Sequence, residues 1–258
     1  MFLAVDIGNT SITLGLFQAE TLGARWRLAS DNERTSDEYG LLVAQLLERA
    51  GVSPGEVGRI AIASVVPPLT GTFQRACRDY LHAEPLVVDA GTRTGIPLRY
   101  EDPKQVGADR VVNAVAVRRI YRGAACIVDF GTATIFDAIS AEGEYLGGAI
   151  APGIGIASDA LFRRAAKLPR VEITRPPSAI GRNTVHSLQS GLLFGYVGLV
   201  EGMVARFRAE LGAGMKTFGT GALVETIARE TSVIDIVEPW LALEGLRILY
   251  DLNRNSRV

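Results

Sequence analysis

Histidine and cysteine are scarce in this chain of 258 residues. Its two cysteines, Cys77 and Cys126, lie far apart, and neither has another cysteine or a histidine at metal-ligand spacing. This argues against a zinc site and suggests no disulfide, so we expect two buried, inert thiols. With only His82 and His186 present, catalysis by a histidine dyad has little to draw on.

The chain also lacks an excess of either charge and lacks long apolar runs. Lys and Arg number 27 and Asp and Glu 28, so no basic face for nucleic acid is indicated. The apolar stretch from Leu192 to Val200 stops at Glu201, which argues against a membrane span. The N-terminal residues have no signal-peptide pattern, and we expect a cytoplasmic protein that binds neither nucleic acid nor membrane.

Two common nucleotide-binding motifs are missing. The chain has no Gly-x-x-x-x-Gly-Lys-Ser/Thr motif and no Gly-x-Gly-x-x-Gly after its first strand. The composition, with 48% hydrophobic and 21% charged residues, is that of a globular protein with a core. The length suits one large domain or two moderate ones.

One local pattern occurs twice. A short apolar run ends in Asp6-Ile7-Gly8 and is followed by small polar residues and an alternating strand; Asp129-Phe130-Gly131 occupies the same setting half a chain later. Two such strand–turn–strand units predict a duplicated α/β architecture with a cleft between its halves. Helices are predicted after a capping box at residues 35–38 and over residues 69–81, 108–122, 185–210, 222–231 and 241–253.

These turns suit phosphoryl transfer, in which positioning and charge compensation do most of the catalysis. Gly8 allows a tight turn that exposes backbone N–H groups, and Asp6 is placed to hold a hydrated Mg²⁺. Gly131 and Thr132 provide similar groups in the second half. The alternative is two ordinary hairpin turns, each capped by its aspartate.

Several motifs in this order resemble the type III pantothenate kinases over nearly the whole chain. Each motif is weak alone, but their order and spacing together are specific. The C-terminal Pro239–Leu246 also resembles the family's ending. The motifs are Asp6–Thr10, Tyr100–Pro103, Gly107–Arg110, Asp129–Ala133 and Gly147–Gly153.

The resemblance implies an α/β, actin-like ATPase (ribonuclease H-like) fold of two duplicated domains, here residues 1–117 and 118–258, each with a mixed central sheet. It implies transfer of a phosphate from ATP to pantothenate, giving 4'-phosphopantothenate in the first step of coenzyme A biosynthesis. It also implies Mg²⁺, a monovalent cation (K⁺ or NH₄⁺) and a homodimer.

The resemblance also assigns roles to individual residues. Asp109 matches the proton acceptor, and Asp129 matches the monovalent-cation ligand. The expected ATP contacts are Asp6, Ile7, Gly8, Asn9, Thr10, Ser11, Ile12, Thr13 and Thr132. The expected pantothenate contacts are Tyr100, Gly107, Ala108, Asp109, Arg110 and Thr184.

Asp109 falls at the start of a predicted helix, where the helix dipole favours the charged carboxylate and keeps its basicity low. This suits a loose transition state, in which orienting the acceptor hydroxyl matters more than base strength. The alternatives are a helix cap for Asp109, a surface ion pair for Arg110 and core packing for Tyr100. One departure is Thr220-Gly221-Ala222, where the family often has Thr-Gly-Gly, so this loop is not assigned to the site.

Two other functions fit the pattern less well. Another actin-like kinase, for a sugar or acetate, would use the same two turns but not Tyr100 with Gly107–Arg110. A non-catalytic regulatory relative would have no need of Asp6, Asp109, Asp129 and Thr132 together.

Overall fold

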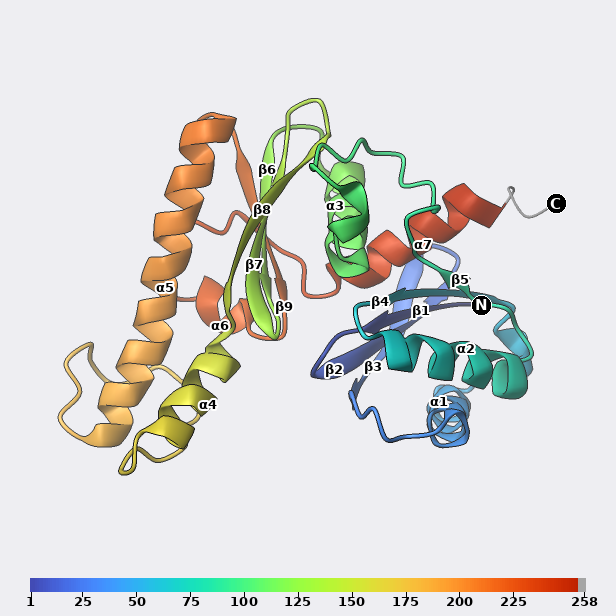
Figure 1. The fold of residues 1–258 in the computed structure, drawn as a ribbon, viewed down its shortest axis with the longest axis horizontal. Helices are drawn as coiled ribbons and strands as arrows, with labels where there is room; N and C mark the ends of the chain where they lie inside the picture. The colour runs from blue at the N-terminus through green and yellow to red at the C-terminus, as the bar shows by residue number, and fades with distance from the viewer. Residues whose placement is uncertain (255–258) are drawn as a thin grey trace. The chain divides into compact units, whose positions relative to one another are not determined.

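A computed structural model describes residues 1–254 of the chain (Figure 1). The described residues form two compact units. The first contains residues 1–96, 101–116 and 241–254, and the second contains residues 97–100 and 117–240. The chain therefore passes from one unit to the other inside a helix and returns to the first unit for its last helix.

The first unit is built on a five-stranded mixed sheet in the order β3-β2-β1-β4-β5. β1, β2 and β3 are antiparallel neighbours, whereas β4 and β5 run parallel to β1. The predicted hairpin at Asp6 is confirmed as β1–β2. The strands are β1 (Phe2–Ile7), β2 (Ser11–Gln18), β3 (Thr21–Ala29), β4 (Arg59–Ser64) and β5 (Leu86–Val87).

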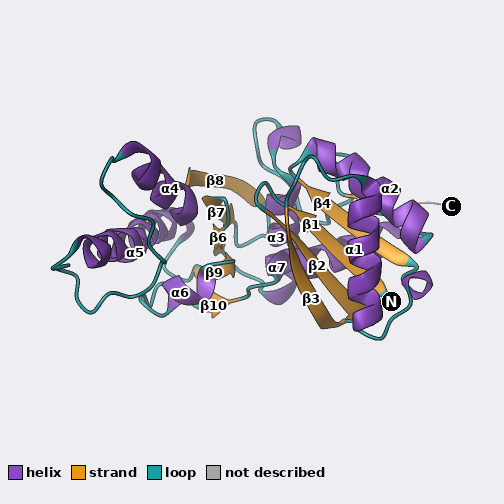
Figure 2. Ribbon diagram, turned by 90° about the horizontal axis from the view of Figure 1, so that it is seen from below, coloured by secondary structure: helices purple, strands orange, loops and turns teal. Residues whose placement is uncertain are grey.

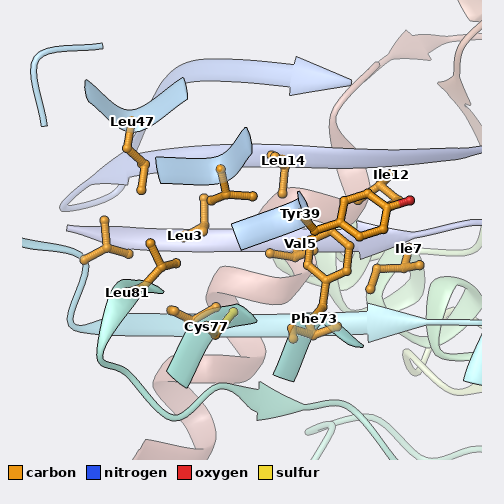
Figure 3. Packing of buried hydrophobic residues seen from close by; sticks show 14 of the residues in the cluster. Leu3, Val5, Ile7, Ile12, Leu14, Tyr39, Leu47, Phe73, Cys77 and Leu81 are labelled. Atoms are coloured by element: carbon orange, nitrogen blue, oxygen red, sulfur yellow. The ribbon is translucent and has the colours of Figure 1, made fainter. Parts of the chain in front are cut away.

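Helices cover both faces of this sheet (Figure 2). On one face α1 (Ser36–Arg49) and α2 (Pro67–Leu81) enclose a core that includes Leu3, Val5, Ile7, Tyr39 and Phe73 (Figure 3). The predicted capping box is present, because the Thr35 side chain accepts from the Glu38 amide and the Glu38 carboxylate accepts from the Thr35 amide. The other face packs against α7 (Leu241–Asn253). Two short 3₁₀ turns are η1 (Pro54–Glu56) and η2 (Pro103–Gln105).

The second unit repeats the topology of the first. Its sheet has the order β10-β9-β6-β7-β8, with β6, β7 and β8 antiparallel and β9 and β10 parallel to β6. The strand that ends in Asp129 thus occupies the place of the strand that ends in Asp6, and the predicted duplication is confirmed. The strands are β6 (Ala125–Phe130), β7 (Ala133–Ile139), β8 (Tyr145–Pro152), β9 (Lys216–Gly221) and β10 (Ile236–Val237).

One long helix dominates the packing of the second unit. α5 (Thr184–Leu211) places Leu193, Val200 and Val204 in a core with β6 and β7, and α4 (Ile154–Arg164) and the short α6 (Val224–Ala228) join it. Among residues 1–254, α5 alone is long and apolar enough by composition to cross a membrane, and 39% of its most apolar window is buried. A core helix of a globular protein meets the same test.

The division of the chain differs from the expected domains at the C-terminus. The boundary after residue 116 lies within α3 (Ala108–Ile120), next to the expected boundary after residue 117. The expected second domain, however, ran to residue 258, whereas α7 packs on β1, β2 and β4 of the first unit. The amphipathic pattern of α7 marks a buried face without saying which sheet buries it.

Candidate active site

The first turn of interest joins β1 to β2. The Gly8 amide donates to the Ser11 carbonyl at 3.0 Å, and a side-chain carbon at Gly8 would lie 3.2 Å from the same oxygen. The sequence pattern suggested that the turn exposes its amides, but the amide of Gly8 itself closes the hairpin. The exposed residues of the turn are Asn9 and Thr10 at its tip.

The strand register sorts the residues of this segment into two groups. Asp6 pairs with Thr13, and both side chains lie on the face away from the α1–α2 core. Ile7 pairs with Ile12, and both are fully buried in that core. Of the eight expected ATP contacts at residues 6–13, the two isoleucines therefore have only their backbones to offer a ligand.

Asp109 is the second residue of α3. Its Oδ1 accepts the Arg110 amide at 2.8 Å, and the amides of Arg110 and Val111 both donate to the Gly107 carbonyl at 3.1 Å. A side chain at Gly107 would collide with the Asp109 carboxylate, so the glycine provides the space that this side chain occupies. The carboxylate does cap the helix start, as the alternative interpretation expected.

Burial changes the chemistry of this carboxylate. It raises the pKa of Asp109 above its usual 3.8, and it outweighs the Arg110 amide and the Arg110 charge, which both lower the pKa. The expectation that the helix dipole would leave Asp109 a weak base is therefore wrong, because desolvation of the charged form has the larger effect. The raised pKa makes Asp109 a better proton acceptor than an exposed aspartate.

Arg110 is a buried residue, with 6% of its surface exposed. That burial excludes the surface ion pair considered as its alternative role. A charged guanidinium in this position is costly to desolvate unless anionic groups compensate it. The segment from Gly107 to Arg110 thus brings a carboxylate and a guanidinium together at one helix start.

The second turn, between β6 and β7, is one residue shorter than the first and is also closed by a glycine amide. The Gly131 amide donates to the Ala133 carbonyl at 3.1 Å, and the half-buried Asp129 pairs with Ile135 across the hairpin. Thr132 lies at the tip of the turn, next to Gly131. The two turns are therefore equivalent in topology and in the use of the glycine amide.

Two glycines outside the predicted site pack against this second turn. The Gly153 amide donates to the Thr132 carbonyl at 3.1 Å, and a side chain at Gly153 would collide with that carbonyl. At Gly221 the φ angle is +94°, and a side chain there would lie 2.6 Å from the Asp129 carboxylate oxygen. The Ala222 amide donates to the Phe130 carbonyl at 3.2 Å.

These glycines belong to segments whose sequence signals were visible. Gly153 ends the glycine-rich stretch of residues 147–153, which lies in β8 except for Gly153 itself, and Gly221 lies in the loop that was set aside because of Ala222. The backbone of that loop reaches the Asp129 turn with the alanine in place. Local sequence could not show which turn each glycine meets, because the contacts join strands distant in the chain.

Tyr100 is held at the edge of the second sheet. The Arg99 amide donates to the Tyr145 carbonyl at 2.8 Å, and the Tyr145 amide donates to the Pro97 carbonyl at 2.9 Å. The half-buried Tyr100 ring lies 6.3 Å from the Tyr145 ring and directly over Gly147, whose φ is +113°. The second unit thus fixes Tyr100 through backbone pairing and ring contacts.

Thr184 is the first residue of α5 and is not close to Tyr100 within the second unit. Tyr100 is beside the first residue of β8, whereas α4, which follows β8, lines a hollow together with Ser187 and Leu188 near the start of α5. A strand of eight residues spans about 25 Å. The two expected pantothenate contacts are therefore not neighbours in one copy of the chain.

Comparison with known proteins decides the family. The family model described as "Type III pantothenate kinase" matches residues 2–206. The chain belongs to the type III pantothenate kinase family. The relatives of that name include one from Roseiflexus sp. (strain RS-1), 52% identical over 99% of this chain and 100% of the relative, and one from Moorella thermoacetica, 53% identical over 98% and 100%.

Solved structures confirm the actin-like fold expected for a type III pantothenate kinase. A putative Baf family transcriptional activator from Campylobacter jejuni matches with a TM-score of 0.61 at 19% identity, covering 98% of this chain and 99% of that one. An archaeal actin homolog matches with a TM-score of 0.51 at 12% identity, covering 99% of both chains. At these identities the likeness concerns the fold alone.

Proposed function

We propose that this chain transfers the γ-phosphate of ATP to the primary hydroxyl of pantothenate, the first step of coenzyme A biosynthesis, in the cytoplasm. Membership of the type III pantothenate kinase family supports this reaction. The single observation in the structure that carries it is the Asp109 carboxylate, oriented at a helix start with a raised pKa. Such a carboxylate is suited to orient and deprotonate an alcohol.

The proposal assigns ATP to the first turn. Residues 6–13 are assigned to the triphosphate, and Thr132 is assigned as a further ATP contact. Among residues 1–254 no three acidic, histidine or cysteine side chains form a metal cage. A magnesium ion that keeps its waters and is bound mainly by ATP needs only one carboxylate, and the half-buried Asp6 fits that role, through water. When bound, Mg²⁺ neutralises charge on the phosphates.

Pantothenate is assigned to Tyr100, Gly107–Arg110 and Thr184. The buried Arg110 guanidinium suits the pantothenate carboxylate, because an anion offsets the cost of burying the cation. Tyr100 offers an aromatic face and a hydroxyl. Asp109 then accepts the proton of the attacking hydroxyl.

A monovalent cation is assigned to Asp129. Its carboxylate, the Thr132 hydroxyl and the carbonyls of this turn are oxygen donors, the type that K⁺ prefers. We expect activity to fall when sodium replaces potassium at constant ionic strength, because the smaller ion fits several fixed oxygens less well. Steady-state rates in the two salts measure this, and equal rates would remove the assignment.

The family also implies a homodimer, and two features of the second unit support it. Gly191, Gly195 and Gly198 lie on the exposed side of α5 with no atoms of the described chain near their open faces. Beside them, α4 and α5 line an open hollow of about 790 Å³ with a mostly apolar lining. In a dimer, Thr184 of a second copy can join the site that contains Tyr100.

The test of the proposed function is the Asp109→Asn variant. We expect it to lose at least about a hundredfold in turnover, the usual contribution of a positioned base, while it still binds pantothenate. A coupled ADP-release assay measures turnover, and isothermal titration calorimetry measures pantothenate binding. Lost binding with an intact fold would contradict the role of Asp109 as the base.

The same assay separates the competing functions. Wild-type enzyme should release ADP with pantothenate and not with hexoses or acetate. Preference for a hexose or acetate would indicate another actin-like kinase. Turnover in the wild type no higher than in Asp109→Asn would indicate a non-catalytic relative.

A further inference from the structure

The first phosphate turn is tied to the segment that follows β3. We propose that Ser30 and Tyr39 are positioning residues that hold the turn at residues 8–11 in its ATP-binding shape. This inference rests on the proposed function, because it takes that turn to be an ATP contact. Neither residue belongs to the motifs that identify the family, and neither is expected to touch the substrates.

Ser30 holds both sides of the turn. Its hydroxyl donates to the Gly8 carbonyl at 2.5 Å, and its amide donates to the Thr10 carbonyl at 3.1 Å. One residue thus fixes two carbonyls that flank the exposed tip at Asn9. Its position follows from the strand register, because Ala29, just before it, pairs with Ser11 on β2.

Fixing these carbonyls also aims two amides. In a planar trans peptide the C=O of one residue and the N–H of the next point in opposite directions. With the Gly8 and Thr10 carbonyls directed at Ser30, the amides of Asn9 and Ser11 are directed away from it. Successive backbone amides directed out of a turn are the type of donor that binds a phosphate oxygen.

Tyr39 in turn holds the segment that carries Ser30. Its hydroxyl accepts the Asp31 amide at 2.9 Å. The same hydroxyl lies 3.2 Å from the Ala29 carbonyl and 3.1 Å from the Asp31 carbonyl, so its single proton is shared between these two acceptors. These groups belong to the residues immediately before and after Ser30. Tyr39 therefore constrains the backbone on both sides of the serine.

The ring of Tyr39 gives this contact a rigid base. The residue is fully buried, and its ring lies 4.7 Å from the Phe73 ring, centroid to centroid. Figure 3 shows the two rings together over the strands, with the Tyr39 hydroxyl on the side of Ile12. Ile7 and Ile12, which flank the turn, belong to the same core. The Tyr39 hydroxyl and Ser30 thus connect the hydrophobic core to the turn.

The test uses Ser30→Ala, with Ser30→Thr as the conservative rescue and Thr72→Val as the control. Thr72 also donates its hydroxyl to a backbone carbonyl, that of Pro68, in the same unit but outside the proposed site. Binding of a non-hydrolysable ATP analogue is measured by calorimetry, Michaelis constants for ATP and pantothenate by the coupled assay, and stability by thermal unfolding.

We expect Ser30→Ala to weaken analogue binding and raise the Michaelis constant for ATP about five- to tenfold, the range of one lost hydrogen bond. The constant for pantothenate should change less than about twofold, and the melting temperature no more than in Thr72→Val. Ser30→Thr should restore ATP affinity. Tyr39→Phe, which keeps the ring, should shift ATP affinity in the same direction as Ser30→Ala.

Analogue binding in Ser30→Ala equal to wild type would overturn the inference. So would equal weakening of both substrates together with a lower melting temperature, since that pattern marks a general structural role. Wild-type protein that binds the analogue but does not phosphorylate pantothenate would instead count against the proposed function. In that case, weaker analogue binding by Ser30→Ala would still support the role of Ser30.

Discussion

At the scale of single residues, Asp109 experiences two opposed influences. The helix start and Arg110 favour its charged form, whereas burial favours the neutral form and prevails. Because the folded state binds this proton more tightly than the unfolded state, the free energy of unfolding decreases as pH rises from the unfolded pKa through the raised one. Above the raised pKa the charged carboxylate destabilises the folded state.

The Asp109→Asn variant should therefore be more stable than wild type at neutral pH, although it is inactive. The advantage should shrink as the pH falls through the raised pKa towards the usual 3.8, and below 3.8 the wild-type carboxyl is protonated in both states. Thermal unfolding of both proteins across this pH range measures the difference. A variant that is less stable at neutral pH would show that the carboxylate contributes to the fold.

The activity of the wild type should show the same shift. Because only the deprotonated carboxyl accepts a proton, activity should fall on the acidic side at a pH above the usual 3.8 of an aspartate. The sequence placed Asp109 at a helix start, and that is confirmed. It could not reveal the raised pKa, because the burial of a side chain depends on the folded structure.

At the scale of elements, α3 and α7 pack in close contact. Gly245 on α7 faces the backbone of Val112 on α3, one turn after Asp109, and a side chain at Gly245 would collide with the Val112 carbonyl. Leu243, two residues before Gly245 on α7, packs against Gly15 on β2. The Pro239–Leu246 segment, known from the sequence only as a family-like ending, thus supports the helix that carries the proposed base.

We expect Gly245→Ala to destabilise the protein by about 1–3 kcal/mol, the usual cost of overpacking. The matched control is Gly71→Ala on α2, where a side-chain carbon would come no closer than 3.8 Å to another group. There the substitution should be stabilising by up to about 1 kcal/mol through helix propensity. Urea unfolding measures both; a neutral Gly245→Ala would mean that the helices can separate without cost.

Elements were predictable where local rules decide them. The capping box predicted the start of α1, and the helix predicted over residues 69–81 is α2, which begins two residues earlier, at Pro67. β10 was not predicted as an element, and the bounds of α4 were not predicted. Glycine-rich sequence around Gly153 concealed the start of α4, and β10 consists of two residues whose pairing with β9 leaves no local pattern.

At the scale of the whole molecule, the duplication was visible in the sequence as two Asp-x-Gly turns. The equivalent strand orders of the two sheets confirm it. The place of α7 was not visible, because an amphipathic helix can pack on either sheet. Similarly, the apolar stretch from Leu192 to Val200 did not show which side of α5 packs in the core and which side stays open.

That open part of α5 gives a test of the proposed dimer. Gly195→Arg should produce monomers, because the new side chain fills the space over the glycines while arginine favours the helix itself. Gly55→Arg is the control, since Gly55 is an exposed glycine with open space around it in the first unit. Sedimentation equilibrium measures both masses; a dimeric Gly195→Arg would place the interface elsewhere.

The reactivity of the two cysteines reports on the opening of each unit separately. Cys77 lies in the core of the first unit and Cys126 in that of the second, and burial raises the pKa of each thiol to about 12. Alkylating reagents attack thiolates, so each cysteine reacts only when its own unit opens. Peptide mapping after timed labelling would then give separate opening rates for the two units in one unmodified chain.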